Sequence, residues 1–320
     1  LQRCGLEGQD VLEEIKAAVR RMGEQGIRVL ALANKPVTAT DQELSEETVQ
    51  DGLSFIGLIG MIDPPRTESI EAIERCHQAG IQVKMITGDH RTTAFSIGKE
   101  LGLATDGDIA YTGAELAAMS DAELWENAEK SNIFARVAPE HKLRLVTTLQ
   151  QRGHIVAMTG DGVNDAPALK QANIGTAMGI TGTAVSKDAA DIVLADDNFA
   201  SISAAVEEGR RVYDNLIKSL AFLLPTNLGL AFILIYGIIF FPFDPVTKAL
   251  LLPMQPAQLL WINLVAAVTL ALPLAFEAKE ANIMNRPPRQ PREPLFNTFV
   301  VFRVVMVSIL MTVGTIALFS

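Results

Sequence analysis

Short apolar runs alternate with amphipathic segments from residue 54 to residue 211. The apolar runs have the length and composition of buried strands, and the segments between them repeat apolar residues at the spacing of a helix face. The expected strands are 54–62, 81–86, 132–137, 154–158, 174–178 and 191–194, and the expected helices include 67–78, 92–101 and 140–150. Strands that alternate with helices favour a parallel sheet covered on both faces. The pattern therefore predicts an α/β fold for this region.

The first 53 residues have a different pattern. An amphipathic helix is expected over 11–23 and a strand over 27–33, and residues 36–47 are polar and loop-like. We interpret residues 1–53 as the end of a separate domain. The sequence begins without Met, which favours a piece of a longer protein.

The last third of the chain is apolar and contains three stretches long enough to cross a bilayer, which takes roughly 20 residues. They cover residues 219–241, 257–276 and 299–320. A buried helix of a soluble protein can be equally apolar, but three such stretches in succession favour membrane spans. The pattern predicts an all-α transmembrane region over 212–320.

The charges in the loops between these stretches predict an orientation. The segment between the second and third stretches carries Lys279, Arg286, Arg289 and Arg292. The loop between the first two stretches carries only Lys248. Basic loops remain on the cytoplasmic side of a membrane. Because two crossings return the chain to the same side, residues 1–211 are expected in the cytoplasm.

Composition excludes some partners and cross-links. The formal net charge of -10 argues against nucleic acid as a partner. Cys4 and Cys76 are the only cysteines, so no disulfide framework is expected, and a reducing compartment fits the globular part. The mean hydropathy of +0.24 is high for a soluble protein and reflects the apolar last third.

One string, at residues 158–169, is especially informative and reads MTGDGVNDAPAL. It places two carboxylates, Asp161 and Asp165, around a glycine turn between an apolar run and a helix-like segment. Acidic side chains at the carboxyl end of a strand in an open α/β sheet lie where ligands bind. Such oxygen ligands suit Mg²⁺, which proteins hold through one or two carboxylates and a substrate phosphate. A solvated acidic turn would explain Gly-Asp-Gly alone, but the whole string is more specific.

Other positions fit chemistry on a phosphoryl group. Thr87 ends an expected strand and, with Gly88 and nearby N–H groups, can hold a phosphoryl oxygen at a helix start. An ordinary helix cap is the alternative for Thr87. Lys142 lies near the start of an expected helix, where an ammonium can offset charge on a transferring phosphoryl group, and a solvated surface lysine is the alternative. Asn164 can orient water or the phosphoryl group.

Three strings in chain order carry a family resemblance. They are DPPR at 63–66, MITGDH at 85–90 and TGDGVNDAPALK at 159–170. With them the chain resembles the haloacid dehalogenase superfamily and, within it, the P-type cation-transporting ATPases of the calcium-pump-like branch. The resemblance extends over essentially the whole chain. It implies the end of a nucleotide-binding domain over 1–53, the C-terminal part of a phosphorylation domain with an incomplete Rossmann-like parallel sheet over 54–211, and three membrane helices over 212–320.

The resemblance also implies roles for the phosphoryl-site residues. Asp161 matches the family's Mg²⁺ ligand, and Asp165 supports it. Thr87 matches the hydroxyl that binds a phosphoryl oxygen, and Gly88 allows close approach. Lys142 matches the lysine that offsets charge on the aspartyl phosphate.

The same resemblance implies contacts with ATP. Asn164 would touch the phosphoryl group. Asp63 and Arg66 look like hinge residues near the ribose and phosphates of the nucleotide, and Arg28 is similar to an arginine near its phosphates. Surface salt bridges are the alternative for the two arginines.

The nucleophile of the family has no counterpart in this sequence. The family phosphorylates an Asp in an Asp-Lys-Thr-Gly-Thr stretch, and neither this stretch nor the family's Thr-Gly-Glu loop occurs here. A covalent aspartyl phosphate divides hydrolysis into two steps. We therefore expect the chain alone not to hydrolyse ATP.

Polar residues in the first two apolar stretches form a candidate ion pathway. Thr226 and Asn227 lie in the first stretch, and Asn263 and Thr269 lie in the second. Polar groups inside a membrane are costly and often functional, although hydrogen bonds between helices are the alternative. By position the two asparagines match ligands of calcium pumps.

The carboxylates that accompany these ligands in calcium pumps are not matched. Leu230, Ala266 and Ala267 occupy the positions where charged or hydroxyl ligands are expected from the resemblance. A hard divalent ion prefers charged oxygens, so the transported ion is left open.

The sequence as a whole predicts part of a P-type ATPase, an integral membrane cation translocase that uses ATP and Mg²⁺ in a bacterial plasma membrane. A membrane-anchored phosphohydrolase is one alternative. A non-catalytic membrane subunit or sensor is the other.

Overall fold

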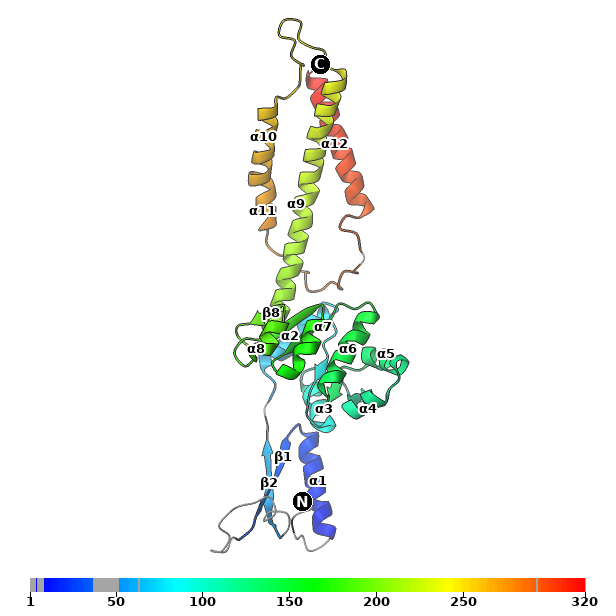
Figure 1. Ribbon diagram of the computed structural model, residues 1–320, viewed down its shortest axis with the longest axis vertical. Helices are drawn as coiled ribbons and strands as arrows, with labels where there is room; N and C mark the ends of the chain where they lie inside the picture. The colour runs from blue at the N-terminus through cyan, green and yellow to red at the C-terminus, as the bar shows by residue number, and fades with distance from the viewer. Residues whose placement is uncertain (1–3, 5–8, 37–51, 63, 292, 320) are drawn as a thin grey trace. The chain divides into compact units, whose positions relative to one another are not determined.

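The computed structural model describes residues 4, 9–36, 52–62, 64–291 and 293–319 (Figure 1). The chain divides into two compact units, 1–203 and 204–320. The predicted domain boundaries at residues 53 and 211 remain predictions.

The first unit begins with a helix and a two-stranded sheet (Figure 1). These elements are α1 (Gln9–Glu24), β1 (Arg28–Asn34) and β2 (Ser54–Met61). The two strands are antiparallel, with Arg28 opposite Met61. The expectation that strand 54–62 joins the parallel sheet was therefore wrong, and the pairing crosses the predicted boundary at residue 53. A Cβ on Gly60 of β2 would lie 2.6 Å from side-chain atoms of Met22 and Ile27, so the missing side chain allows this close packing.

The first parallel sheet has the strand order β3-β5-β4. Its strands are β3 (Met85–Ile86), β4 (Ala110–Thr112) and β5 (Ile133–Ala135). Its helices are α2 (Thr67–Gln78), α3 (Arg91–Glu100), α4 (Gly113–Ala118), α5 (Asp121–Lys130) and α6 (Pro139–Gln151). Side chains of a strand alternate between faces. Phe134 accordingly packs with buried residues of α4, α5 and α6, whereas Ile133 and Ala135 pack with Ala94 of α3.

The second parallel sheet has the order β6-β7-β8. Its elements are β6 (Ala157–Gly160), a 3₁₀ turn η2 (Val163–Asp165), α7 (Ala166–Gln171), β7 (Ile174–Met178), α8 (Ala184–Ala189) and β8 (Ile192–Leu194). Met158 packs with Val146 of α6 and with Ala168 and Leu169 of α7. The α/β fold predicted from the sequence is confirmed, but the described parallel strands form two sheets, with β3 and β6 each at an edge.

Among the described residues, three helical segments are long and apolar enough to cross a membrane, as predicted. They are α9 (Phe199–Phe240), the continuous segment of α10 (Pro256–Val265), a π-helix η3 (Ala266–Ala271) and α11 (Leu272–Ala275), and α12 (Thr298–Phe319). α9 begins at Phe199, well before residue 219, where the first span was predicted to start.

Within the second unit, the segment after α11 is bound to α9 by side chains of both. Arg210 donates to the carbonyl oxygens of Ile283 at 2.9 Å and Arg286 at 2.8 Å. Lys218 forms an ion pair with Glu277 at 2.9 Å. The first part of the basic loop predicted from the sequence, up to Arg286, is therefore held by contacts with α9.

Candidate functional site

The turn after β6 is closed by the buried side chain of Asp165, which is only 5% exposed. Its Oδ2 accepts hydrogen bonds from the N–H groups of Asp161 at 3.2 Å and Gly162 at 3.1 Å. A Cβ on Gly160 would lie 2.5 Å from the Cβ of Asp165, so only glycine fits at that position. The predicted Asp-rich turn is thus a fixed structure at the carboxyl end of β6.

Lys142 of α6 meets the second oxygen of Asp165. Its Nζ donates to Oδ1 at 2.6 Å, and both side chains are largely buried. Charged hydrogen bonds of this length are stronger than neutral ones, and burial removes much of the screening by water. The structure therefore brings together Lys142 and Asp165, two residues that the sequence assigned to one site.

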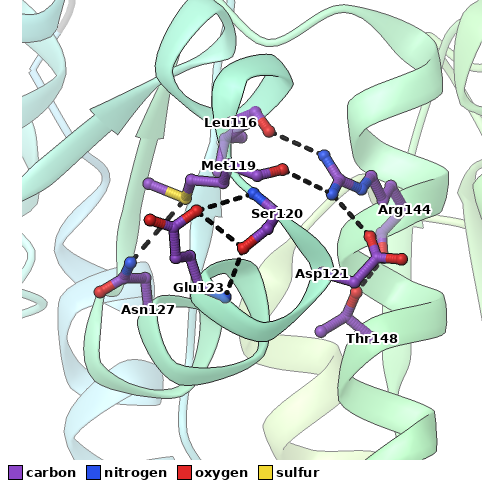
Figure 2. A network of polar contacts seen from close by, with 8 residues as sticks. All are labelled: Leu116, Met119, Ser120, Asp121, Glu123, Asn127, Arg144 and Thr148. Atoms are coloured by element: carbon purple, nitrogen blue, oxygen red, sulfur yellow. Dashed lines mark hydrogen bonds and ion pairs between the residues drawn. The ribbon is translucent and has the colours of Figure 1, made fainter.

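Arg144 fastens α6 to the turn between α4 and α5 (Figure 2). Its guanidinium donates to the carbonyl oxygens of Leu116 at 2.8 Å and Met119 at 2.9 Å, and to Oδ1 of Asp121 at 2.7 Å. Figure 2 also shows Ser120 and Glu123 of the α5 cap beside these contacts. Because Arg144 lies two residues after Lys142, this anchoring restrains the helix that carries the lysine.

Asp161 leaves its carboxylate available to a ligand. The residue is exposed, and its side chain makes no hydrogen bond within the described part of the chain. Its backbone carbonyl oxygen is held by the N–H of Thr183 at 2.9 Å and by Oγ of Ser186 at 3.0 Å. Asn164 is also exposed, on η2. The backbone of Asp161 is thus fixed while its side chain remains open.

Thr87 lies at the carboxyl end of β3, in a local turn. Its Oγ1 lies 3.0 Å from Oδ2 of Asp89 and accepts from the N–H of Asp89 at 3.1 Å. The carbonyl oxygen of Thr87 accepts from the N–H of Val137 at 3.2 Å, two residues before α6 begins. Gly88 has open space where a Cβ would be. Thr87 is therefore tied to the segment leading to Lys142, although no direct contact joins their side chains among the described residues.

The acidic side chains of this turn fit the needs of Mg²⁺, although no cluster of three or more His, Cys, Asp and Glu forms within the described ranges. Mg²⁺ is commonly held through one or two carboxylates, waters and substrate phosphate. Asp161 offers a free carboxylate, whereas both oxygens of Asp165 already accept hydrogen bonds. The donor set favours Asp161 as the direct ligand and Asp165 as its support.

The nucleotide-binding predictions are not joined to this turn. Arg28 lies exposed at the start of β1. Arg66, directly before α2, has Nη1 at 3.5 Å from the carbonyl oxygen of Asp197. Asp63 lies outside the described residues.

The structure does not bring the predicted ion-pathway side chains together by hydrogen bonds. Oγ1 of Thr226 donates to the carbonyl oxygen of Phe222 at 3.1 Å, one turn back in its own helix. Thr269 does the same with Val265 at 2.6 Å, inside the π-helix. Asn227 and Asn263 are exposed, and neither has a hydrogen-bonding partner for its side chain among the described residues.

Three residues that support the site were missed by the sequence analysis. They are Thr183 and Ser186, which hold the carbonyl of Asp161, and Asp197, which holds the loop before Thr183. A Thr directly before a helical segment is a helix-capping signal, and Thr183 does accept from the N–H of Ser186 at 3.2 Å. The contact with Asp161 spans 25 positions, and local patterns carry no signal for it.

Comparison with known proteins gives two family matches. Residues 5–173 match haloacid dehalogenase-like hydrolase, and residues 251–320 match the family described as cation transporting ATPase, C-terminus. A cation-transporting ATPase of Synechocystis is 51% identical over 317 residues, which are 97% of this chain and 34% of that protein.

Other relatives are similar over comparable lengths. A probable cation-transporting ATPase F of Mycobacterium tuberculosis is 50% identical over 95% of this chain and 33% of its own length. A calcium-transporting ATPase of Bacillus subtilis is 44% identical over 96% of this chain and 33% of its own length. The chain thus spans about a third of the length of the curated relatives it matches.

Proposed function

The chain belongs to the haloacid dehalogenase-like hydrolase family, and from this premise we propose that it is part of an ATP-driven cation transporter that forms an aspartyl phosphate. The observation that carries the proposal is the Lys142–Asp165 ion pair, which closes the turn that presents Asp161. A positive group, an acidic support and a free carboxylate at the end of one strand form a site suited to a phosphoryl group and Mg²⁺.

Asp161 would hold Mg²⁺ directly, and Asp165 would keep the turn and Lys142 in place. Bound Mg²⁺ would neutralise charge that develops on the phosphoryl oxygens. Lys142 adds a fixed positive charge in a partly buried position. Because the charge is already in place, little reorganisation of the site is needed during the reaction. Thr87 and Gly88 would receive a phosphoryl oxygen, and Asn164 would contact the same group.

The unpaired edges of β3 and β6 support a role for a further segment that carries the nucleophile. In the described residues β3 pairs only with β5, and β6 pairs only with β7. Thr87 follows β3, and Asp161 follows β6. In our proposal a strand that ends in the phosphorylated Asp pairs with these edges, so that its carboxylate lies between the two groups.

The three membrane-length helices and the similarity to cation-transporting ATPases support transport as the use of this chemistry. We place the protein in a bacterial plasma membrane, with the phosphoryl site in the cytoplasm and ATP as the phosphoryl donor. Arg28, Asp63 and Arg66 are proposed nucleotide contacts. Asn227 and Asn263, with Thr226 and Thr269, are the proposed ion pathway.

We refer to the proposed site of Thr87, Lys142, Asp161 and Asp165, at one edge of the α/β unit, as the rim. A membrane-anchored phosphohydrolase would use the same rim without an ion pathway. A non-catalytic subunit or sensor would need neither. The proposed transporter is distinguished from both by phosphorylation that depends on a transported cation.

The test uses the full-length protein that contains this chain, supplied with ATP labelled in its γ-phosphate. We expect acid-stable incorporation of label that requires Mg²⁺ and responds to one of Ca²⁺, Mn²⁺, Na⁺ or K⁺. Phosphate release without a covalent intermediate would favour the phosphohydrolase. No ATP-dependent reaction with any cation would favour the sensor and contradict the proposal.

A further inference from the structure

Asp197, two residues before α9, holds a loop that lies far from it in sequence. Its Oδ1 accepts from the N–H of Ile180 at 2.9 Å, and its Oδ2 accepts from the N–H and Oγ1 of Thr181 at 2.7 and 2.8 Å. The N–H of Ile180, followed by the groups of Thr181, lowers the pKa of the Asp197 carboxyl to about 2. The carboxylate is therefore charged, and all three contacts are charge-assisted.

The backbone of Asp197 is shaped for this contact. Its φ is +49°, a left-handed conformation that Asp and Asn adopt more readily than other residues with a Cβ. Holding the carboxylate in this turn directs it at the loop, so the backbone conformation and the hydrogen bonds are parts of one arrangement.

The loop itself has little freedom. It follows β7 and starts at Gly179, whose N–H donates to the carbonyl oxygen of Leu194 at 2.8 Å. A Cβ on Gly182 would lie 1.9 Å from the carbonyl oxygen of Met178, so the loop folds tightly back on the strand end. Asp197 contacts this loop at its middle, between the two glycines.

The far end of the loop contacts the phosphoryl site. The N–H of Thr183 and the Oγ of Ser186 hold the backbone carbonyl of Asp161 at 2.9 and 3.0 Å. Ser186 is fully buried, and its hydroxyl also lies 2.8 Å from the carbonyl oxygen of Thr183. Asp197 is thus linked to the backbone of Asp161 through the loop, by its hydrogen bonds to residues 180 and 181, the backbone of residues 181–183, and the hydrogen bond of Thr183 to Asp161.

We propose that Asp197 is a positioning residue for Asp161, because it fixes the 179–183 loop that holds the Asp161 backbone. Its effect on Mg²⁺ rests on the proposed function, whereas its effect on the Asp161 backbone does not. Asp197 does not touch the phosphoryl group or the metal. Its loss leaves the Asp161 carboxylate present but less well oriented.

Asp196 provides a matched control next door in sequence. Its carboxylate also accepts two hydrogen bonds, from the N–H of Asn198 at 3.2 Å and from Oγ of Ser201 at 2.6 Å. These partners lie within five positions, and neither touches the 179–183 loop. Asp196→Asn and Asp197→Asn therefore make the same chemical change, but only Asp197→Asn alters contacts with the 179–183 loop.

Asp197→Asn retains a residue suited to positive φ, so it tests the acceptors rather than the backbone. The new amide keeps one acceptor oxygen, but its NH2 group faces an N–H donor of the loop, and the charge-assisted bonds are lost. We expect amide hydrogen exchange in the full-length protein to become about tenfold faster over residues 180–183, and also faster at 161–162. Asp196→Asn should change exchange only near residues 198–201. Unchanged exchange at 161–162 in the Asp197 variant would overturn the proposal.

The second measurement is the Mg²⁺ dependence of phosphorylation by labelled ATP. Asp197→Asn should raise the half-saturating Mg²⁺ concentration several-fold while the rate at saturating Mg²⁺ changes less than twofold, and Asp196→Asn should do neither. A general loss of fold would instead lower the saturated rate. An active wild-type protein with the same Mg²⁺ dependence in both variants would overturn the inference. A wild-type protein that is not phosphorylated at all would contradict the proposed function, and hydrogen exchange would still decide whether Asp197 holds the Asp161 backbone.

Discussion

The predicted phosphoryl-site residues of the α/β unit and two predicted ion-pathway residues of the membrane unit have different partners. At the rim of the α/β unit, Lys142 of α6 reaches Asp165 after β6, and Ser186 of α8 reaches the backbone of Asp161. In the membrane unit, Thr226 and Thr269 each bond to a carbonyl one turn back in their own helix. The first set of contacts joins different elements and fixes a site in advance. The second set satisfies each hydroxyl locally and builds no shared site.

The difference shows which polar groups of the described chain are held in place by other elements. A phosphoryl site needs groups held in place before the ligand arrives, and Lys142, Asp165 and the backbone of Asp161 are held in this way. An ion site in a membrane needs several oxygens directed at one point, and the hydroxyls of Thr226 and Thr269 instead bond within their own helices. The predictions below either remove the difference or make it more pronounced.

The largest effect is expected at the rim. Lys142→Met and Asp161→Asn should each lower the rate of aspartyl phosphate formation by about 100-fold or more, because a fixed charge and a metal ligand are lost. Phosphorylation of the full-length protein by labelled ATP measures this. Lys99→Met, which breaks the exposed Lys99–Asp106 ion pair, is the control and should be nearly neutral. Equal rates in Lys142→Met and Lys99→Met would show that the partly buried pair has no catalytic role.

Gly160→Ala tests how tightly the rim is built. The new methyl group would lie 2.5 Å from the Cβ of Asp165, so the turn must shift and the Lys142 contact must lengthen. We expect a loss of about 1–3 kcal/mol in stability together with impaired phosphorylation. Gly88→Ala is the matched control for stability, because a Cβ there meets open space. A thermal midpoint for Gly160→Ala that equals that of Gly88→Ala would contradict the described packing.

Substitutions in the spans compare two kinds of side chain by their effect on cation affinity: hydroxyls that bond within their own helix, and amides without a partner among the described residues. Thr226→Val and Thr269→Val each remove only a bond within one helix, so apparent cation affinity should change less than about twofold. Asn227→Ala and Asn263→Ala remove the proposed ion ligands and should weaken it by about tenfold. Cation-stimulated ATPase activity measures both. If the threonine variants had the larger effect, the two asparagines would not be the main ion ligands of the proposed pathway.

The smallest effect is expected for Lys84, on the pH dependence of stability. Nζ of Lys84 donates to the carbonyl oxygens of Glu129 at 3.1 Å and Ser131 at 2.7 Å, and burial lowers its pKa to about 8. An unfolded lysine has a pKa of roughly 10.4, so between about pH 8 and pH 10.4 the unfolded chain binds more protons. The Lys84 contribution to stability should therefore rise with pH across this window.

Thermal unfolding of the wild type and of Lys84→Met over the same pH range tests this sign. The wild type should gain stability relative to the variant as the pH rises from about 8 to about 10. Parallel curves would show that the environment of Lys84 does not disfavour its charge. A Lys130→Met control should remain parallel to the wild type, since Lys130 is exposed.

Much of the α/β fold could be predicted from local pattern, because its helices and strands alternate in the expected order. Helix Thr67–Gln78 and strand Ile174–Met178 match their predicted bounds. Strand pairing is not local: the antiparallel partner of Ser54–Met61 is Arg28–Asn34, and a long segment of the sequence separates the two strands. The short elements Ala110–Thr112 and Ala184–Ala189 were missed because each spans too few residues to show a period.

The candidate site divides along the same line. Asp161 and Asp165 could be found because one string contains both, with Gly160 at a position where a side chain would clash with Asp165. Lys142 was a candidate from its chemistry and from the family resemblance, but its ion pair with Asp165 spans 23 positions and was not predicted. Nothing local marks Asp197 as different from Asp196, and only the folded chain shows that one reaches the 179–183 loop while the other does not.

The central claim is that Thr87, Lys142, Asp161 and Asp165 serve one magnesium-phosphoryl site. A cryo-electron microscopy map of the full-length protein with Mg²⁺ and beryllium fluoride, a mimic of the aspartyl phosphate, tests it most directly. The account predicts Mg²⁺ on the Asp161 carboxylate, with the fluoride group between Lys142 and the Thr87 hydroxyl. Density for the metal and the mimic at another place, or a Thr87 hydroxyl directed away from it, would contradict the account.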